Sequence, residues 1–239
     1  MKTSEAIRTR INSIAEGVIF GYDDLEIAAS NRYAAAMTLR RLVAQNQIRR
    51  AAKGRFYRPI TTRLGEMPLS VQDVADGFLY KAGKHIGYIT GTNAFAQMGI
   101  TTQISSTVVI ASAKYRRPTN RSGYRFTFIT QPNLITADNI PLLRFLDALR
   151  FIKRIPAVTP TQVVVALLQL LQEMTTDQVS SLIELSQNYA PQVRAMLGAM
   201  LDSIGLRSDV LKQGLNQFSR FNCGIALESL PQSTYWQLQ

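Results

Sequence analysis

Basic and polar side chains gather between residues 31 and 58, and their types suit contact with nucleic acid. Arginine and lysine bind phosphate oxygens, and arginine and asparagine also read the edges of bases. The candidates for contact with DNA are Asn31, Arg32, Tyr33, Met37, Arg40, Arg41, Arg49, Arg50, Lys53, Arg55 and Arg58. We expect base contacts from Asn31, Arg32, Tyr33 and Arg40, and phosphate contacts from Arg49, Arg50, Lys53 and Arg55. The alternative is a solvated surface whose charges bind nothing, which is the usual role of a charge run.

No set of residues in the sequence is typical of a catalytic site. The single histidine, His85, follows two lysines, and we interpret it as a surface or strand-edge residue rather than a base. Asp23 and Asp24 are adjacent acids at an expected helix start, where the helix dipole favours negative charge, so we expect no metal site there. Cys223 has no plausible histidine partner and is expected to be buried. We therefore predict no enzymatic activity, no cofactor and no metal.

The basic side chains need a helix to position them, and residues 31–46 supply its pattern. Apolar residues recur there with helical spacing and share one face, namely Ala35, Leu39, Leu42 and Val43. The other faces are basic and have small residues at their middle, which is typical of a helix that enters a major groove. We expect Ser30 or Asn31 to cap this helix.

Two short strand-like runs follow over residues 48–59, around a turn at Lys53 and Gly54. Before the helix we expect a first helix over residues 4–16, an extended run over 18–20, and a brief second helix that begins at Asp23. The segment 59–68 reads as a link. This order of elements predicts a winged helix-turn-helix over residues 1–65, in which the hairpin is the wing.

The rest of the chain predicts two further parts and an α+β fold overall. Residues 66–135 form a mixed α/β segment, with a helix over 70–84, strands over 86–90, 106–111 and 124–129, and a short helix over 92–98. The basic, turn-rich stretch 114–123 either touches DNA phosphate or is a solvated hairpin tip. Residues 136–239 are mainly helical, with helices expected over 140–153, 161–174, 177–189, 191–204 and 209–218.

The later helices carry recognisable starts. We expect them to begin at Asp138 or Asn139, Pro160, Thr176, Pro191 and Ser208. Methionines at helical spacing, such as Met196 and Met200, more often fill a core than contact a partner. We expect residues 136–239 to fold alone and to form the protein-facing part of the chain.

Charge is distributed unevenly along the 239 residues, whose net charge is +11. Residues 1–65 hold 12 Lys and Arg against 5 Asp and Glu, residues 66–153 hold 10 against 5, and residues 154–239 hold 5 against 6. The excess favours a nucleic-acid partner on the N-terminal side. With a single cysteine, no signal-peptide pattern and no apolar run long enough for a bilayer, the chain is expected to be cytoplasmic.

Several segments taken in order resemble a known family. They lie over residues 39–50, 53–59, 88–103 and 191–201, and together they resemble the AbiEi-like transcriptional regulators, the antitoxins of type IV toxin–antitoxin systems. The resemblance implies a winged domain that represses its own operon and a C-terminal part that provides antitoxicity in abortive infection, a form of phage defence. It also implies a co-encoded, nucleotidyltransferase-like toxin that is counteracted without a stable complex.

Two hypotheses from different classes follow. The first is a DNA-binding repressor that is also an antitoxin, with double-stranded DNA of its own operator as partner. The second is a protein-interaction or RNA-binding module with a basic winged domain and no antitoxin activity. The two differ in whether duplex DNA from the upstream region is bound in preference to unrelated duplex and to RNA.

Overall fold

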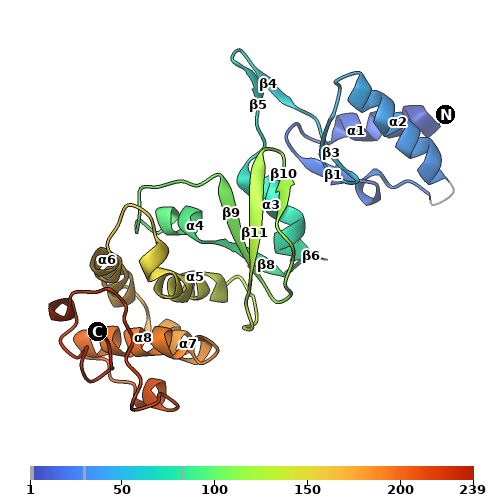
Figure 1. Cartoon of the computed structure of the whole chain (residues 1–239). Helices are drawn as coiled ribbons and strands as arrows, with labels where there is room; N and C mark the ends of the chain where they lie inside the picture. Colours follow the sequence, from blue (N-terminus) through green and yellow to red (C-terminus); the bar gives the residue numbers. More distant parts are fainter. Residues whose placement is uncertain (1–2, 29–30, 82) are drawn as a thin grey trace. The chain divides into compact units, whose positions relative to one another are not determined.

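The structure is a computed structural model that describes residues 3–28, 31–81 and 83–239. The protein is a mixed α and β molecule, in agreement with the expected α+β class, and it divides into two compact units (Figure 1). Unit 1 comprises Met1–Gly77 and Thr119–Tyr124, and unit 2 comprises Phe78–Pro118 and Arg125–Gln239. The units cut across the boundaries that we drew at residues 65 and 135.

Unit 1 contains the expected order of a helix, a short strand, a second helical segment, a longer helix and a hairpin. These elements are α1 (Thr3–Ser13), β1 (Ile19–Gly21), the 3-10 helix η1 (Asp23–Leu25), α2 (Arg32–Ala44), β2 (Arg49–Ala52) and β3 (Arg55–Tyr57). The three strands form one antiparallel sheet in the order β1-β3-β2. A second hairpin follows, made of β4 (Ile60–Thr62) and β5 (Gly65–Met67), and α3 (Val71–Leu79) begins after it.

The core of unit 1 confirms the amphipathic pattern of α2. Ala35, Leu39 and Leu42 are buried, and Val43 is half-buried against the same core. They pack with residues from the first helix, the sheet and the 3-10 helix, namely Ile7, Ile11, Phe20, Leu25, Ile48 and Phe56. Burial of this apolar stripe fixes which faces of α2 remain outside.

Three local expectations in unit 1 were wrong. The first helix ends at Ser13 rather than residue 16, because the N–H of Gly17 donates to the carbonyl of Arg58 and draws the chain toward β3. The second helix is limited to η1, because Glu26 adopts a left-handed conformation with φ of 52°. The segment 59–68 is the β4-β5 hairpin rather than a plain link. Asn31 occupies the N-cap of α2 without a side-chain hydrogen bond, and Ser30 lies outside the described residues.

Unit 2 combines a small sheet with a set of helices. Its strands and first helix are β6 (Tyr80–Lys81), β7 (Lys84–His85), β8 (Gly87–Thr90), α4 (Thr92–Gln97), β9 (Thr107–Ser112) and β11 (Tyr124–Thr130). The helices that follow are α5 (Asn139–Arg150), α6 (Pro160–Gln172), α7 (Thr176–Ser186) and α8 (Pro191–Ser203). Shorter 3-10 segments are η3 (Ile152–Arg154), η4 (Asp209–Lys212) and η5 (Leu227–Ser229).

The pairing of the central strands corrects the interpretation of residues 114–123 as a hairpin tip. β8 and β9 are antiparallel, but β9 and β11 are parallel, with Val108 opposite Phe126. Parallel neighbours require a connection that returns to the starting edge of the sheet. The stretch 114–123 is therefore not a hairpin between β9 and β11 but a crossover connection. Its last part, β10 (Thr119–Arg121), pairs with β11, so a hairpin turn lies at Ser122 and Gly123 and the sheet order is β10-β11-β9-β8.

Two helices differ from expectation. The helix expected over residues 70–84 ends at Leu79, after which the chain forms the short antiparallel pair β6-β7. The helix expected over 209–218 is limited to η4, and Gly214 with φ of 77° turns the chain soon after it. One cap is shifted by a residue, because Thr175 rather than Thr176 forms a capping box with Gln178.

A single hydrophobic core joins the sheet of unit 2 to its helices. Tyr88, Phe95 and Ala111 from the strand region share this core with Leu143 and Leu146 of α5. Helix α5 contacts β8 on one side and α7 and α8 on the other (Figure 1). The helices after residue 136 therefore share part of their core with the sheet of unit 2.

Buried polar groups connect the same elements. Asp147 of α5 is fully buried and accepts hydrogen bonds from the hydroxyls of Tyr88 (2.7 Å), Thr90 (2.8 Å) and Tyr189 (3.0 Å). The amide nitrogen of Gln131 donates to both tyrosine hydroxyls, which closes a ring. Within the described structure no lysine or arginine pairs with Asp147. Burial raises the pKa of this carboxyl, and the hydrogen bonds from Tyr88, Thr90 and Tyr189 lower it less than burial raises it.

The raised pKa of Asp147 predicts a pH-dependent stability. An acid whose pKa is higher in the folded than in the unfolded chain stabilises the fold below its ordinary value of 3.8 and loses that contribution as pH rises through the folded pKa. Relative to Asp147→Asn, the wild type should lose about 1.4 kcal/mol of unfolding free energy per pH unit inside that window. Denaturant titrations of both proteins across pH test this, and parallel stability curves would contradict it.

Candidate nucleic-acid interface

Helix α2 and the β2-β3 hairpin enclose a groove on the surface of unit 1. Its lining residues are Tyr22, Ala36, Arg40, Val43, Arg50, Lys53, Gly54 and Phe56. Arg40 lies on α2, Arg50 lies on β2, and Lys53 lies in the hairpin turn. The turn needs Gly54, whose φ of 71° is strained for other residues. Helix and hairpin therefore present their side chains to one hollow.

The floor of the groove is apolar and well supported. Phe56 of β3 is buried, and its ring packs edge-on against Tyr22 at 6.4 Å between centroids. The ring of Phe20 lies 6.3 Å from Phe56 on the core side. Aromatic packing of this kind holds the hairpin against the body of the unit, so the cations above it have a rigid base.

The cations of the groove keep their charge unpaired. Arg40, Arg50 and Lys53 are exposed, and no ion pair involves them among the described residues. The guanidinium of Arg50 makes only a local bond, from Nε to the carbonyl of Ala52 at 3.3 Å. No carboxylate lines the groove. Three cations held close together without an acid form a site that attracts an anion.

Two other predicted contact residues are engaged within unit 1. Arg49 forms a forked pair with Glu66 of β5 and also donates to the side chain of Asn46 at 2.7 Å. Arg58 donates to the carbonyl of Ile14 at 3.0 Å and pairs with Glu16 at 3.2 Å. The structure thus places both arginines as ties between segments, away from the groove lining.

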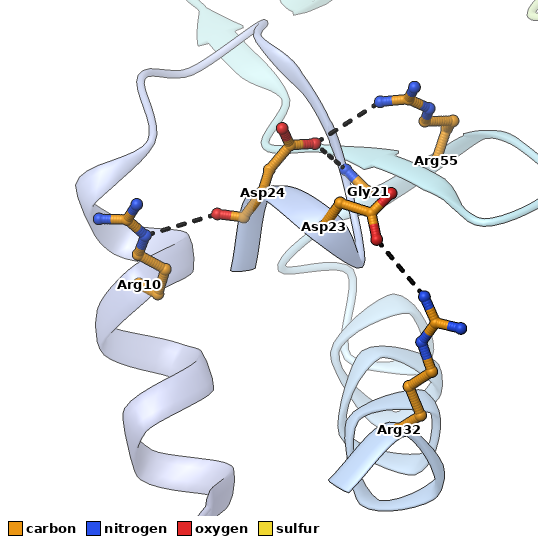
Figure 2. A network of polar contacts seen from close by, with 6 residues as sticks. All are labelled: Arg10, Gly21, Asp23, Asp24, Arg32 and Arg55. Atoms are coloured by element: carbon orange, nitrogen blue, oxygen red, sulfur yellow. Dashed lines mark hydrogen bonds and ion pairs between the residues drawn. The ribbon is translucent and has the colours of Figure 1, made fainter. Parts of the chain in front are cut away.

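The adjacent acids at the start of η1 act as a local hub (Figure 2). The carboxylate of Asp24 accepts the N–H of Gly21 at 2.6 Å and lies 3.5 Å from Arg55, while its carbonyl accepts from Arg10. The carboxylate of Asp23 lies 3.4 Å from Arg32. These acids offset two of the predicted DNA contacts, Arg32 and Arg55. No cluster of metal-binding side chains occurs among the residues that the structure describes.

The remaining candidates lie on the exposed faces of α2. Tyr33 is 80% exposed and Met37 is 49% exposed, and with Arg40 they follow one stripe of the helix beside the groove. Asn31 is exposed at the start of the same helix. Arg41 points instead toward α1, where it lies 3.5 Å from the hydroxyl of Ser4. The structure therefore gathers Arg40, Arg50 and Lys53 at the groove and leaves Arg41 outside it.

The sequence analysis did not identify the acids that pair with Arg49 and Arg58, or the aromatic residues under the groove. Glu16 and Glu66 come from segments that carried no functional signal, and their partners became visible only in the folded unit. Tyr22 and Phe56 lay in expected turn and strand regions, and the alternation of aromatic with basic residues in β3 was the one available sign of a groove floor.

Comparison with known proteins gives a family but no activity. A family model described as "Family of unknown function (DUF6088)" matches residues 6–179. The chain belongs to this family. The match covers unit 1 from residue 6 and continues to the first turn of α7 in unit 2, so the groove lies within the shared region of the DUF6088 family. No curated protein matches the sequence.

A solved structure supports the fold. "Crystal structure of RV2827C protein from Mycobacterium tuberculosis" is similar to this chain with a TM-score of 0.52 and 14% sequence identity. The similarity covers 92% of this chain and 83% of the other. At this identity the similarity shows that the α+β architecture recurs in another protein. No helix in the described parts of the DUF6088 chain is long and apolar enough to cross a membrane.

The hub at Asp24 predicts different roles for two adjacent acids. In Asp24→Ala the backbone N–H of Gly21 loses its carboxylate acceptor. The free energy of unfolding of unit 1 should therefore fall by about 1–2 kcal/mol, and the amide protons of β1 should exchange faster. Asp23→Ala is the matched control, because it removes only a 3.4 Å pair between largely exposed side chains and should leave exchange unchanged. Hydrogen exchange of residues 19–21 in both variants measures this, and equal effects would contradict it.

Proposed function

We propose that unit 1 binds double-stranded DNA as a winged helix-turn-helix and that the protein is a transcriptional repressor. The observation that carries the proposal is the groove, where a helix and a hairpin supply three cations without a neighbouring acid. A helix beside a basic hairpin can place its exposed stripe in a major groove while the hairpin holds the phosphates.

The proposal assigns separate roles to the helix and the hairpin. Tyr33, Met37 and Arg40 contact base edges from α2, because they are the exposed stripe of that helix. Arg50 and Lys53 contact phosphates from the hairpin. Arg49 and Arg58 support the unit rather than the DNA, because both donate their hydrogen bonds to protein acceptors.

DNA binding should depend on salt and on the hairpin cations. If Arg50 and Lys53 neutralise about 2 phosphates, affinity should fall roughly tenfold between about 50 and 200 mM salt. Lys53→Ala and Arg50→Ala should each lower the salt slope by about 1 on every duplex, whereas Arg40→Ala should relax sequence preference by about 1–3 kcal/mol. Fluorescence anisotropy with the protein's own upstream duplex, a scrambled duplex and RNA of equal length measures these effects.

The control for the DNA measurements is Arg220→Ala, which removes an exposed arginine of unit 2 and should leave binding unchanged. Stronger binding to RNA than to either duplex would favour the alternative, an RNA-binding module with a basic winged domain. Equal losses on cognate and scrambled duplex for Arg40→Ala would show that α2 does not read bases.

We also propose that the protein is the antitoxin of a type IV toxin–antitoxin system, which autoregulates its operon and opposes a nucleotidyltransferase-like toxin. Support comes from the resemblance of residues 39–50, 53–59, 88–103 and 191–201 to the AbiEi-like regulators. The negative balance of residues 154–239 fits an activity of unit 2 that is separate from DNA binding.

The two activities should separate by mutation. The full chain that carries Arg50→Ala and Lys53→Ala should fail to repress its promoter and should still relieve the growth defect caused by the neighbouring toxin, because both changes lie in unit 1. Promoter reporter activity and growth are measured in the same strains, with Arg220→Ala as the control. Loss of protection together with repression would contradict a separate antitoxin activity in unit 2.

A further inference from the structure

Unit 2 contains a second cationic hollow, formed by other residues than the groove of unit 1. It lies where the parallel strands β9 and β11 both end, at Ser112 and Thr130, and its lining continues into the loops that follow them. The β6-β7 pair closes another side. The carboxyl ends of neighbouring parallel strands are a common place for ligands, because the chain leaves both strands there in loops.

Three cations line this pocket without an acid. They are Lys81 of β6 and Lys114 and Arg116 of the segment after β9. In the described part of the chain none of them forms an ion pair, and Arg116 is held over the ring of Phe78 at 5.6 Å. Such a set of positive charges favours an anion with several oxygens, as in a phosphate group.

A polar atom at the pocket has no partner. The ring of His85 packs on Tyr80 at 4.6 Å between centroids, and its Nδ1 is buried without a hydrogen bond. His85 belongs to the pocket lining. A buried nitrogen that lacks a partner costs free energy, and here that cost falls on a residue of the pocket lining.

The wall of the pocket is held rigidly by the buried polar ring. Asn133 in the loop after β11 is buried, its amide donates to the carbonyl of Leu185, and its carbonyl accepts from Asn188 at 2.7 Å. Its backbone N–H donates to Gln131, whose amide nitrogen bonds to Tyr88 and Tyr189. The loop is therefore fixed before any ligand arrives, which lowers the ordering cost of binding.

The rest of the lining is apolar, and the pocket is large enough for a small molecule. Its volume is about 540 Å³, and its lining includes the apolar side chains of Ile86, Leu134 and Ile135 beside the three cations. Leu134 is 75% exposed beside it. Pockets of roughly 300–1,000 Å³ accept ligands of drug or cofactor size.

We propose that this pocket binds a phosphorylated small molecule with a flat, largely apolar ring system, of the nucleotide class. The phosphate binds Lys81, Lys114 and Arg116, and the ring system covers Ile86 and Leu134 within reach of His85. The site is separate from the proposed DNA groove, since all of its residues belong to unit 2.

The only histidine of the chain provides a direct probe of this site. Ribonucleoside monophosphates added to the full chain at up to roughly 5 mM, enough for a Kd near 1 mM, should shift the single imidazole proton resonances of His85 in a saturable way. Inorganic phosphate and the free nucleosides are the comparison arms, and each should shift these resonances less at equal concentration.

Variants of the cations test the phosphate contact. Lys81→Gln and Lys114→Gln should each weaken nucleotide binding about tenfold, measured by calorimetry and by the His85 shifts. Arg117→Gln is the matched control, because this exposed neighbour of Arg116 does not line the pocket and should leave affinity unchanged. Several outcomes would overturn the proposal: no shift with any nucleotide, equal shifts with phosphate alone, a shift with duplex DNA only, or equal losses in the control.

Discussion

Unit 2 depends on a carboxylate that has been buried without a cation. Asp147 can occupy the interior because three hydroxyls donate to it and because Gln131 satisfies two of those hydroxyls in turn. The three donors to Asp147 come from β8 and from the turn before α8, and Gln131 comes from the loop after β11. Loss of any member leaves a buried polar group unpaired, so the ring specifies how sheet and helices fit together. The shared hydrophobic core supplies the burial that makes this specificity strong.

In unit 1, acidic side chains form ion pairs with the arginines that hold its segments together. Glu16 and Glu66 hold Arg58 and Arg49 as ties between segments that are distant in sequence. The same carboxylate oxygen of Asp24 accepts the N–H of Gly21 at 2.6 Å and lies 3.5 Å from Arg55. Since exposed ion pairs contribute little stability by themselves, the hydrogen bonds to backbone carbonyls and N–H groups matter more than the pairing of charges. Three of the cations that form no ion pair among the described residues, Arg40, Arg50 and Lys53, line the groove.

Local pattern was sufficient for much of the fold and for the members of the candidate site. The apolar stripe of α2, the glycine turn at Gly54 and the helix start at Pro160 are all visible within one or two helical turns of sequence. The parallel pairing of β9 with β11 was missed, because a strand pattern states which face is buried and not which way the neighbour runs. The ring around Asp147 was missed for a related reason, since Tyr88 lies 59 positions away from it. The same limit explains why Arg49 and Arg58 were grouped with Arg50 and Lys53.

The two cationic hollows differ in ways that match different anions. The groove of unit 1 is framed by the long exposed face of α2 and by a hairpin, and its cations stand on an aromatic floor with open surface beside them. That geometry suits an extended polyanion, which gains from many separate phosphate contacts. The pocket of unit 2 has a buried, unpartnered imidazole nitrogen and a loop fixed by the ring around Asp147. Such a rigid site gains most from a compact anion that satisfies its fixed donors together, because no further part of an extended chain would find a contact there.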